Sequence, residues 1–162
     1  MDSDEVRVVT TPGTPTAVIA ETTSWDAFPA RWRMLLADVW EFLRGSGLTA
    51  GRNVIVYRDD APSVEVGAEV DAGFAPMGRV VPSSLPAGRA AITVARGAPS
   101  PALLGRAHAR VLEWCTAHGH AVDGVRWEIY GHWAEDQDPD RFETEVYWLL
   151  EPARDGGCST PE

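Results

Sequence analysis

Two stretches of the chain match each other: residues 39–57 (VWEFLRGSGLTAGRNVIVY) and residues 111–130 (VLEWCTAHGHAVDGVRWEIY). Each contains the end of an amphipathic helix, a glycine that stops the helix, and a strand that ends in tyrosine. Tyr57 falls opposite Tyr130 once one residue is inserted in the first stretch. The match indicates an internal duplication, in which each half has the order strand, helix, strand, strand.

Hydrophobic periodicity places the remaining elements around these stretches. Helical spacing of apolar residues predicts helices over residues 28–43 and about 101–118. Alternating or β-branched runs, bounded by glycine, proline and aspartate, predict the strands. The predicted strands cover residues 16–20, 53–57, 63–70, 90–94, 127–133 and 143–150.

These elements predict an α+β domain over residues 16–150, built from two βαββ units at about 16–72 and 88–150. One unit covers one face of its sheet with its helix and leaves the other face open. Two units paired about a pseudo-twofold axis then form an antiparallel sheet with two helices and a central ligand cleft. Residues 1–15 and 151–162 are expected to be flexible tails.

The composition excludes several classes of function. The formal net charge is −10 and all 14 basic residues are arginine, which disfavours direct DNA or membrane binding and excludes a catalytic lysine. Cys115 and Cys158 are too few for a disulfide framework and indicate a reducing compartment. No apolar run is long enough for a bilayer and no signal peptide is recognisable, so the expected location is the cytoplasm. The histidine and cysteine spacing lacks a second zinc-type pair, so neither a metal nor a cofactor is expected.

The alternation of residues along the strands predicts which side chains line the cleft. In the strand after the second helix, the large apolar set of Val125, Trp127 and Ile129 is expected to pack against that helix. Residues of the other parity then face the open side of the sheet. By the same parity, this open side collects all three tyrosines and two carboxylates: Tyr57, Tyr130, Tyr147, Glu128 and Glu145.

Glu128 is the most informative of these residues. It takes the place of Ile55 in the match between the halves and lies among aromatic residues, so we expect partial desolvation and a functional role. A carboxylate walled by aromatic rings attracts flat cationic ligands, and it can also act as a general base towards water. Alternatively, Glu128 is solvated or pairs with a nearby arginine, and the tyrosines are ordinary sheet residues. Trp133, at a strand end beside an acidic loop, is a candidate lid.

Several short motifs, in this order and spacing, resemble the GyrI-like small-molecule-binding domain. That domain also occurs as the effector-binding module of AraC-type and MerR-type multidrug-responsive regulators. The resemblance covers residues from about 16 to 150, and it departs from the family pattern at 97–100 (GAPS), where an aromatic residue often follows Gly-Pro. The motifs that carry it are YRDD (57–60), LPAGR (85–89), Gly97, WEIY (127–130) and TEVY (144–147).

The resemblance implies a duplicated βαββ fold that binds bulky aromatic or cationic small molecules in a central cleft. It gives Glu128 the role of the buried acidic group and gives Tyr130 and Tyr147 the role of pocket walls. No helix-turn-helix precedes the domain in this sequence, so a stand-alone protein that does not contact DNA is expected, as a monomer or weak dimer.

Three functions follow as hypotheses. The first is a binding protein for bulky aromatic, cationic compounds, with Glu128 supplying charge and Tyr57, Tyr130, Tyr147, Glu145 and Trp133 completing the site. The second is a hydrolase of cyclopropane-bearing genotoxic natural products, an activity of some stand-alone members, with Glu128 or Glu145 activating water. The third is a protein-interaction inhibitor, because an acidic surface can occupy the groove of a nucleic-acid-binding partner.

Overall fold

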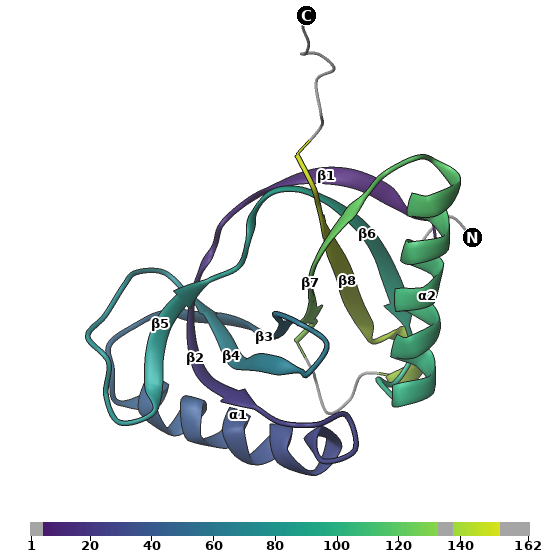
Figure 1. Cartoon of the computed structure of the whole chain (residues 1–162). Helices are drawn as coiled ribbons and strands as arrows, with labels where there is room; N and C mark the ends of the chain where they lie inside the picture. The colour runs from purple at the N-terminus through teal and green to yellow at the C-terminus, as the bar shows by residue number, and fades with distance from the viewer. Residues whose placement is uncertain (1–4, 133–137, 153–162) are drawn as a thin grey trace, which may run out of the picture.

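The computed structural model describes residues 5–132 and 138–152, which form an α+β fold with one eight-stranded antiparallel sheet and two α-helices (Figure 1). A short 3₁₀ turn spans Pro139–Arg141. The helices are α1 (Phe28–Arg44) and α2 (Pro101–Ala117). The strands are β1 (Arg7–Pro12), β2 (Pro15–Thr22), β3 (Ala50–Tyr57), β4 (Ser63–Val70), β5 (Val80–Ser84), β6 (Ala87–Arg96), β7 (Val122–Tyr130) and β8 (Glu143–Leu150).

The predicted duplication is visible in the order of the strands, which is β1-β6-β8-β7-β3-β4-β2-β5. The units β2-α1-β3-β4 and β6-α2-β7-β8 meet along the antiparallel pair of β3 and β7. In that pair Ile55 lies directly opposite Glu128, the two positions that match between the halves. A pseudo-twofold axis therefore passes through this residue pair, and Glu128 lies at the centre of the molecule.

Each unit is preceded by a strand that pairs with the other unit. Strand β1 lies on β6, and β5 lies on β2, so the two lead strands form the two edges of the sheet. The prediction of a tail over residues 1–15 is wrong for Arg7–Pro12, which form β1. This strand has no local signal because its partner lies about 80 residues further along the chain. Residues 1–4 and 153–162, parts of the two predicted tails, lie outside the described residues.

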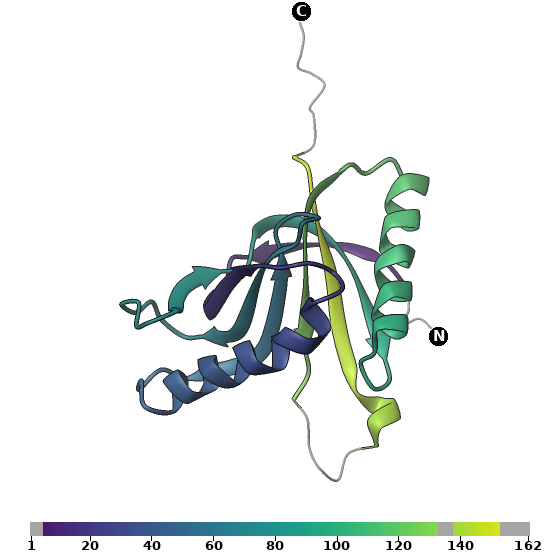
Figure 2. The same ribbon diagram turned by 60° about the horizontal axis from the view of Figure 1, so that its bottom comes forward.

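A serine caps the start of α2 and another lies one turn ahead of α1, and each helix buries one stripe of side chains. The Ser24 hydroxyl accepts a hydrogen bond from the Ala27 amide one turn ahead of α1, and Ser100 accepts one from the Leu103 amide of α2, each over 3.1 Å. The first helix packs on β2 and β4 and the second on β6 and β8 (Figure 2). Within the described residues, no helix is long and apolar enough to cross a membrane.

The register shows that both helices cover the same face of the sheet. One row of directly paired, buried residues runs across six strands on that face, from the core under α1 to the core under α2. Glu128 is the charged member of the row and lies where the two helices separate. The row consists of Ile19, Val66, Ile55, Glu128, Val146 and Thr93.

The opposite face of the central strands is also buried. A separate apolar cluster there joins residues of β3, β6 and β7 with Leu85. The sheet is curved, and both helices lie on its outer, convex side (Figure 1). The central strands are therefore apolar on both faces, unlike the half-open sheet that the sequence predicts. The cluster consists of Val54, Val56, Leu85, Ala90, Trp127 and Ile129.

Candidate functional site

A cavity of about 1100 Å³ lies between α1 and α2, on the helix-covered face of β3 and β7. Its volume is in the upper range of small-molecule sites. Its walls are rich in aromatic side chains, because the helices are far enough apart to leave the rings between them uncovered. Four of the six tryptophans among the described residues line it: Trp25, Trp32, Trp40 and Trp148.

The carboxyl group of Glu128 lies in this cavity and is 3% exposed. The Tyr130 hydroxyl donates to Glu128 Oε1 over 2.5 Å, and the Tyr57 hydroxyl donates to the same oxygen over 3.3 Å. The other oxygen, Oε2, lies 2.7 Å from Nε2 of His108 on α2. Three donors from three elements therefore hold the carboxylate in place and offset part of the cost of burying it.

His108 is held in one tautomer by its second neighbour. Nε1 of Trp148 can only donate a hydrogen bond, and it donates to His108 Nδ1 over 2.9 Å. His108 Nδ1 is therefore unprotonated, and the single ring proton lies on Nε2 and points to Glu128. The distance fits an ion pair, but the imidazole in this arrangement is neutral. Both oxygens of Glu128 therefore accept hydrogen bonds, and among the described residues no arginine lies within ion-pair distance of this carboxyl group.

The two tyrosines that contact Glu128 stay protonated over a wide pH range. Burial raises the pKa of Tyr57, and the negative charge of Glu128 raises it further, while Arg126 acts weakly in the opposite sense. Burial and the charge of Glu128 also raise the pKa of Tyr130 well above its usual value. Both hydroxyl groups are therefore permanent donors to the carboxylate near neutral pH.

Arg126 lies two residues before Glu128 on β7 and lines the same cavity. Its guanidinium group is stacked near three aromatic rings, 4.9 Å from the ring centre of Trp148, 5.6 Å from Trp25 and 5.9 Å from Tyr57. Arg126 is 8% exposed, and its Nη1 donates to the Gly124 carbonyl over 2.9 Å. The cavity thus holds a buried cation beside the buried anion.

The structure separates the residues that the sequence groups on one open side. Tyr57, Glu128 and Tyr130 meet in the cavity, but Glu145 and Tyr147 lie on the opposite face, because Tyr147 pairs with Trp127 across β7 and β8. The prediction from strand alternation fails because it assumes that the large apolar residues of β7, such as Trp127, face the helices. Both faces are covered, and Trp127 faces away from the helices. Trp133 lies outside the described residues.

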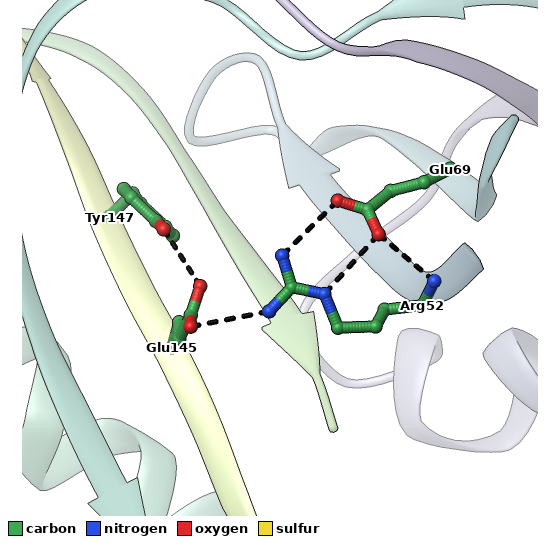
Figure 3. A network of polar contacts seen from close by, with 4 residues as sticks. All are labelled: Arg52, Glu69, Glu145 and Tyr147. Atoms are coloured by element: carbon green, nitrogen blue, oxygen red, sulfur yellow. Dashed lines mark hydrogen bonds and ion pairs between the residues drawn. The ribbon is translucent and has the colours of Figure 1, made fainter. Parts of the chain in front are cut away.

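Glu145 and Tyr147 belong to a polar network on that opposite face (Figure 3). The Tyr147 hydroxyl donates to Glu145 over 2.7 Å, and burial raises the pKa of Tyr147. Arg52 of β3 bridges Glu145 and Glu69 of β4, with 3.2 Å from Nη1 to Glu145 and 3.2 Å from Nε to Glu69. The network therefore links the two units across the centre of the sheet. A smaller cavity of about 250 Å³ lies beside it.

Sequence reasoning missed several residues of the large cavity. His108 is absent from the site residues expected from the sequence, yet it follows Leu104 by four residues and precedes Val111 by three, a spacing that places it on the apolar side of α2. Trp32 and Trp40 follow the apolar spacing of α1, a pattern that does not distinguish the wall of a cavity from a closed core. Arg126 has the parity of Glu128 and could have been placed with it. Within the described residues, no group of three or more His, Cys, Asp or Glu side chains has the arrangement of a metal site.

The chain matches no protein-family model and no curated protein. Solved structures do match. The EcmrR C-terminal domain superimposes with a TM-score of 0.76 at 17% identity, covering 92% of this chain and 98% of that domain. In a complex of EcmrR with DNA, the match covers 59% of the EcmrR chain. The fold is therefore also that of one part of a larger DNA-bound protein.

Two further structures share the fold. SAV2435 bound to tetraphenylphosphonium matches with a TM-score of 0.65 at 14% identity, covering 91% of this chain and 94% of that one. A hydrolase encoded by lin2189 from Listeria innocua matches with a TM-score of 0.60 at 10% identity, covering 91% and 92%. Together these likenesses show that this chain shares the fold of the EcmrR C-terminal domain and of SAV2435, in agreement with the fold expected from the sequence resemblance.

Proposed function

We propose that this protein binds bulky aromatic cations in the cavity between α1 and α2, with Glu128 as the residue that attracts the charge. The observation that carries the proposal is a buried carboxylate in an aromatic cavity that accepts hydrogen bonds from Tyr57, Tyr130 and His108, with no ion pair to an arginine among the described residues. Burying such a charge is costly, and hydrogen bonds offset only part of the cost. A cationic ligand supplies the missing counter-charge.

The walls of the cavity support the aromatic part of the proposal. Tryptophan and tyrosine faces carry partial negative charge, so they attract both flat rings and cations. The tyrosines that could neutralise Glu128 by giving up their protons keep them, because burial raises the pKa of each. The likeness to SAV2435 bound to tetraphenylphosphonium agrees with a ligand of this class.

The proposal is tested with two ligands of similar shape, the cation methyltriphenylphosphonium and the neutral triphenylphosphine oxide. Quenching of tryptophan fluorescence or calorimetry measures the Kd of each. Replacement of the carboxylate in Glu128→Gln keeps the side-chain shape, so we expect the Kd of the cation to rise at least about tenfold, as for loss of a buried charge pair. The Kd of the neutral compound changes by less than about twofold.

Glu145→Gln is the matched control, because this carboxylate lies on the opposite face of the sheet. We expect it to leave the Kd of the cation unchanged. The proposed role of Glu128 is contradicted if Glu128→Gln weakens the binding of both ligands equally. It is also contradicted if Glu145→Gln weakens the binding of the cation as much as Glu128→Gln does.

A second candidate function is hydrolysis of cyclopropane-bearing alkylating compounds. The convergence of a carboxylate, an imidazole and two phenols in one cavity favours it, and the fold is shared with a hydrolase from Listeria innocua. However, both oxygens of Glu128 already accept hydrogen bonds, so a water molecule must compete with these donors before Glu128 can activate it. This function is tested by incubating the protein with such a compound and detecting a water adduct by mass spectrometry. We expect the Glu128→Gln variant to form the adduct more slowly.

A further inference from the structure

The cavity contains a positive group whose hydrogen-bonding capacity is only partly used. The hydrogen bond of Arg126 to the Gly124 carbonyl and its ion pair with Asp60 both use Nη1. No described residue accepts a hydrogen bond from Nε or Nη2 of Arg126. These donors belong to a side chain that is 8% exposed and lines the cavity. Such donors in a buried cation are unusual unless a ligand or water contacts them.

The ion partner of Arg126 is a weak one. The Asp60 side chain lies 2.8 Å from Nη1, but it is 91% exposed, so solvent screens its charge. The three surrounding rings hold the guanidinium in position without cancelling its charge. Arg126 is therefore a fixed and largely uncompensated positive group at the wall of the cavity.

The spacing between Arg126 and Glu128 sets the charge pattern that a ligand meets. Residues two apart on a strand project from the same face with backbone positions about 7 Å apart. His108 carries a single ring proton, so the cavity presents one acidic and one basic side chain on the same face of β7. If a ligand carries two positive groups, Glu128 attracts one of them and Arg126 repels the other.

We propose that Arg126 determines specificity in this cavity by selecting aromatic ligands that carry an anionic group, such as a carboxylate, beside their cationic centre. The inference rests on the proposed function, because Glu128 binds the cationic part. Arg126 donates Nε–H and Nη2–H to the anionic group, a geometry suited to a carboxylate. Within the class of aromatic cations, the preferred ligands are therefore zwitterionic compounds.

Two rhodamine dyes test this proposal. Rhodamine 110 carries a free carboxylate, and rhodamine 123 is its methyl ester, so the pair differs in one anionic charge on the same cationic ring system. The measured quantity is the ratio of the Kd of the ester to the Kd of the acid, from fluorescence anisotropy at pH 7.5. For the native protein we expect a ratio of about ten, as for a charge-assisted pair of hydrogen bonds.

Two variants change this ratio in opposite directions. Arg126→Gln removes the charge, and we expect the ratio to fall to about one, with the ester bound at least as tightly as before. Asp60→Asn removes the competing carboxylate from an exposed position that the fold does not depend on, and we expect the ratio to rise. This second variant keeps the test valid if Arg126→Gln does not fold.

The outcomes separate the inference from the function on which it rests. One outcome is that Glu128→Gln weakens the binding of both dyes, while neither Arg126→Gln nor Asp60→Asn changes the ratio of the two Kd values. This outcome overturns the role of Arg126 and leaves the proposed function in place. A native preference for the ester also overturns it. Failure of the native protein to bind either dye, or methyltriphenylphosphonium, overturns both.

Discussion

Glu128 occupies the position in the second unit that Ile55 occupies in the first, and the two side chains are paired at the pseudo-twofold axis. Duplication alone would place two aliphatic residues there and close the centre of the fold. The carboxylate instead attracts a ring of donors: Tyr57 comes from the first unit, and Tyr130 and His108 come from the second. The asymmetry at this one position is what turns the junction of two similar units into a charged site.

Trp148 holds His108 in one tautomer, because its Nε1 donates a hydrogen bond to His108 Nδ1. In Trp148→Phe the donor to His108 Nδ1 is lost, so the imidazole can accept a second proton and form a true ion pair with Glu128. We expect methyltriphenylphosphonium to bind this variant less tightly as the pH falls from 8 to 5.5, with a Kd that rises at least about fivefold. The Kd of the native protein should change less over the same range.

Titration of ligand binding at several pH values measures both curves. The double variant Trp148→Phe, His108→Gln is the control, because it has no imidazole to protonate and its Kd should not depend on pH. Identical pH profiles for Trp148→Phe and the native protein would contradict the assigned tautomer.

At the scale of elements, strand β4 approaches β2 closely at Gly67. A methyl group added to Gly67 would lie 1.8 Å from the Ala17 carbonyl oxygen, a distance at which backbone atoms must move. We therefore expect Gly67→Ala to lower the free energy of unfolding by at least about 3 kcal/mol, measured by urea denaturation.

Gly105 provides the opposite case. It lies inside α2, and an added methyl group there has no atom within 4 Å. Gly105→Ala should raise the free energy of unfolding by about 0.5–1 kcal/mol, because alanine loses less backbone entropy in a helix. If Gly67→Ala and Gly105→Ala changed the free energy of unfolding equally, the close approach of β2 and β4 would not be a steric constraint at Gly67.

The elements themselves could largely be predicted from the sequence. Both helices and the strands around them have local signals, namely helical spacing for α1 and α2 and alternation for β4 and β8. The edge strands β1 and β5 were missed, because an edge strand buries little apolar surface and its partner lies in the other unit.

Across the whole molecule, burial protects all three tyrosines from ionisation. Burial is the main cause of the raised pKa of each, compared with the ordinary value of 10.0. Unfolded chains lose these protons near pH 10 while the folded protein keeps them, so stability is fully present below pH 10 and falls as the pH rises further. We expect Tyr57 and Tyr130 each to lower the free energy of unfolding by about 1.4 kcal/mol per pH unit above 10, and Tyr147, which is more exposed, to contribute less.

Absorbance at 295 nm measures this titration directly. The folded protein should show no tyrosinate transition near pH 10, and the urea-unfolded protein should show one transition with the amplitude of three tyrosines. Tyr130→Phe should make the decline of stability above pH 10 shallower, whereas a normal tyrosine titration in the folded state would contradict the burial of these hydroxyl groups in solution.

The sequence by itself determined the duplication, the α+β class, the meeting of Tyr57 and Tyr130 beside Glu128, and the absence of lysine chemistry. These features depend on local periodicity and on the match between the halves. Only the tertiary structure decided which face of the sheet carries the site and that His108 and Arg126 belong to it. The physical reason is that alternation along a strand divides residues between two faces but does not say what covers each face. That depends on how the sheet curves and where helices distant in sequence come to rest.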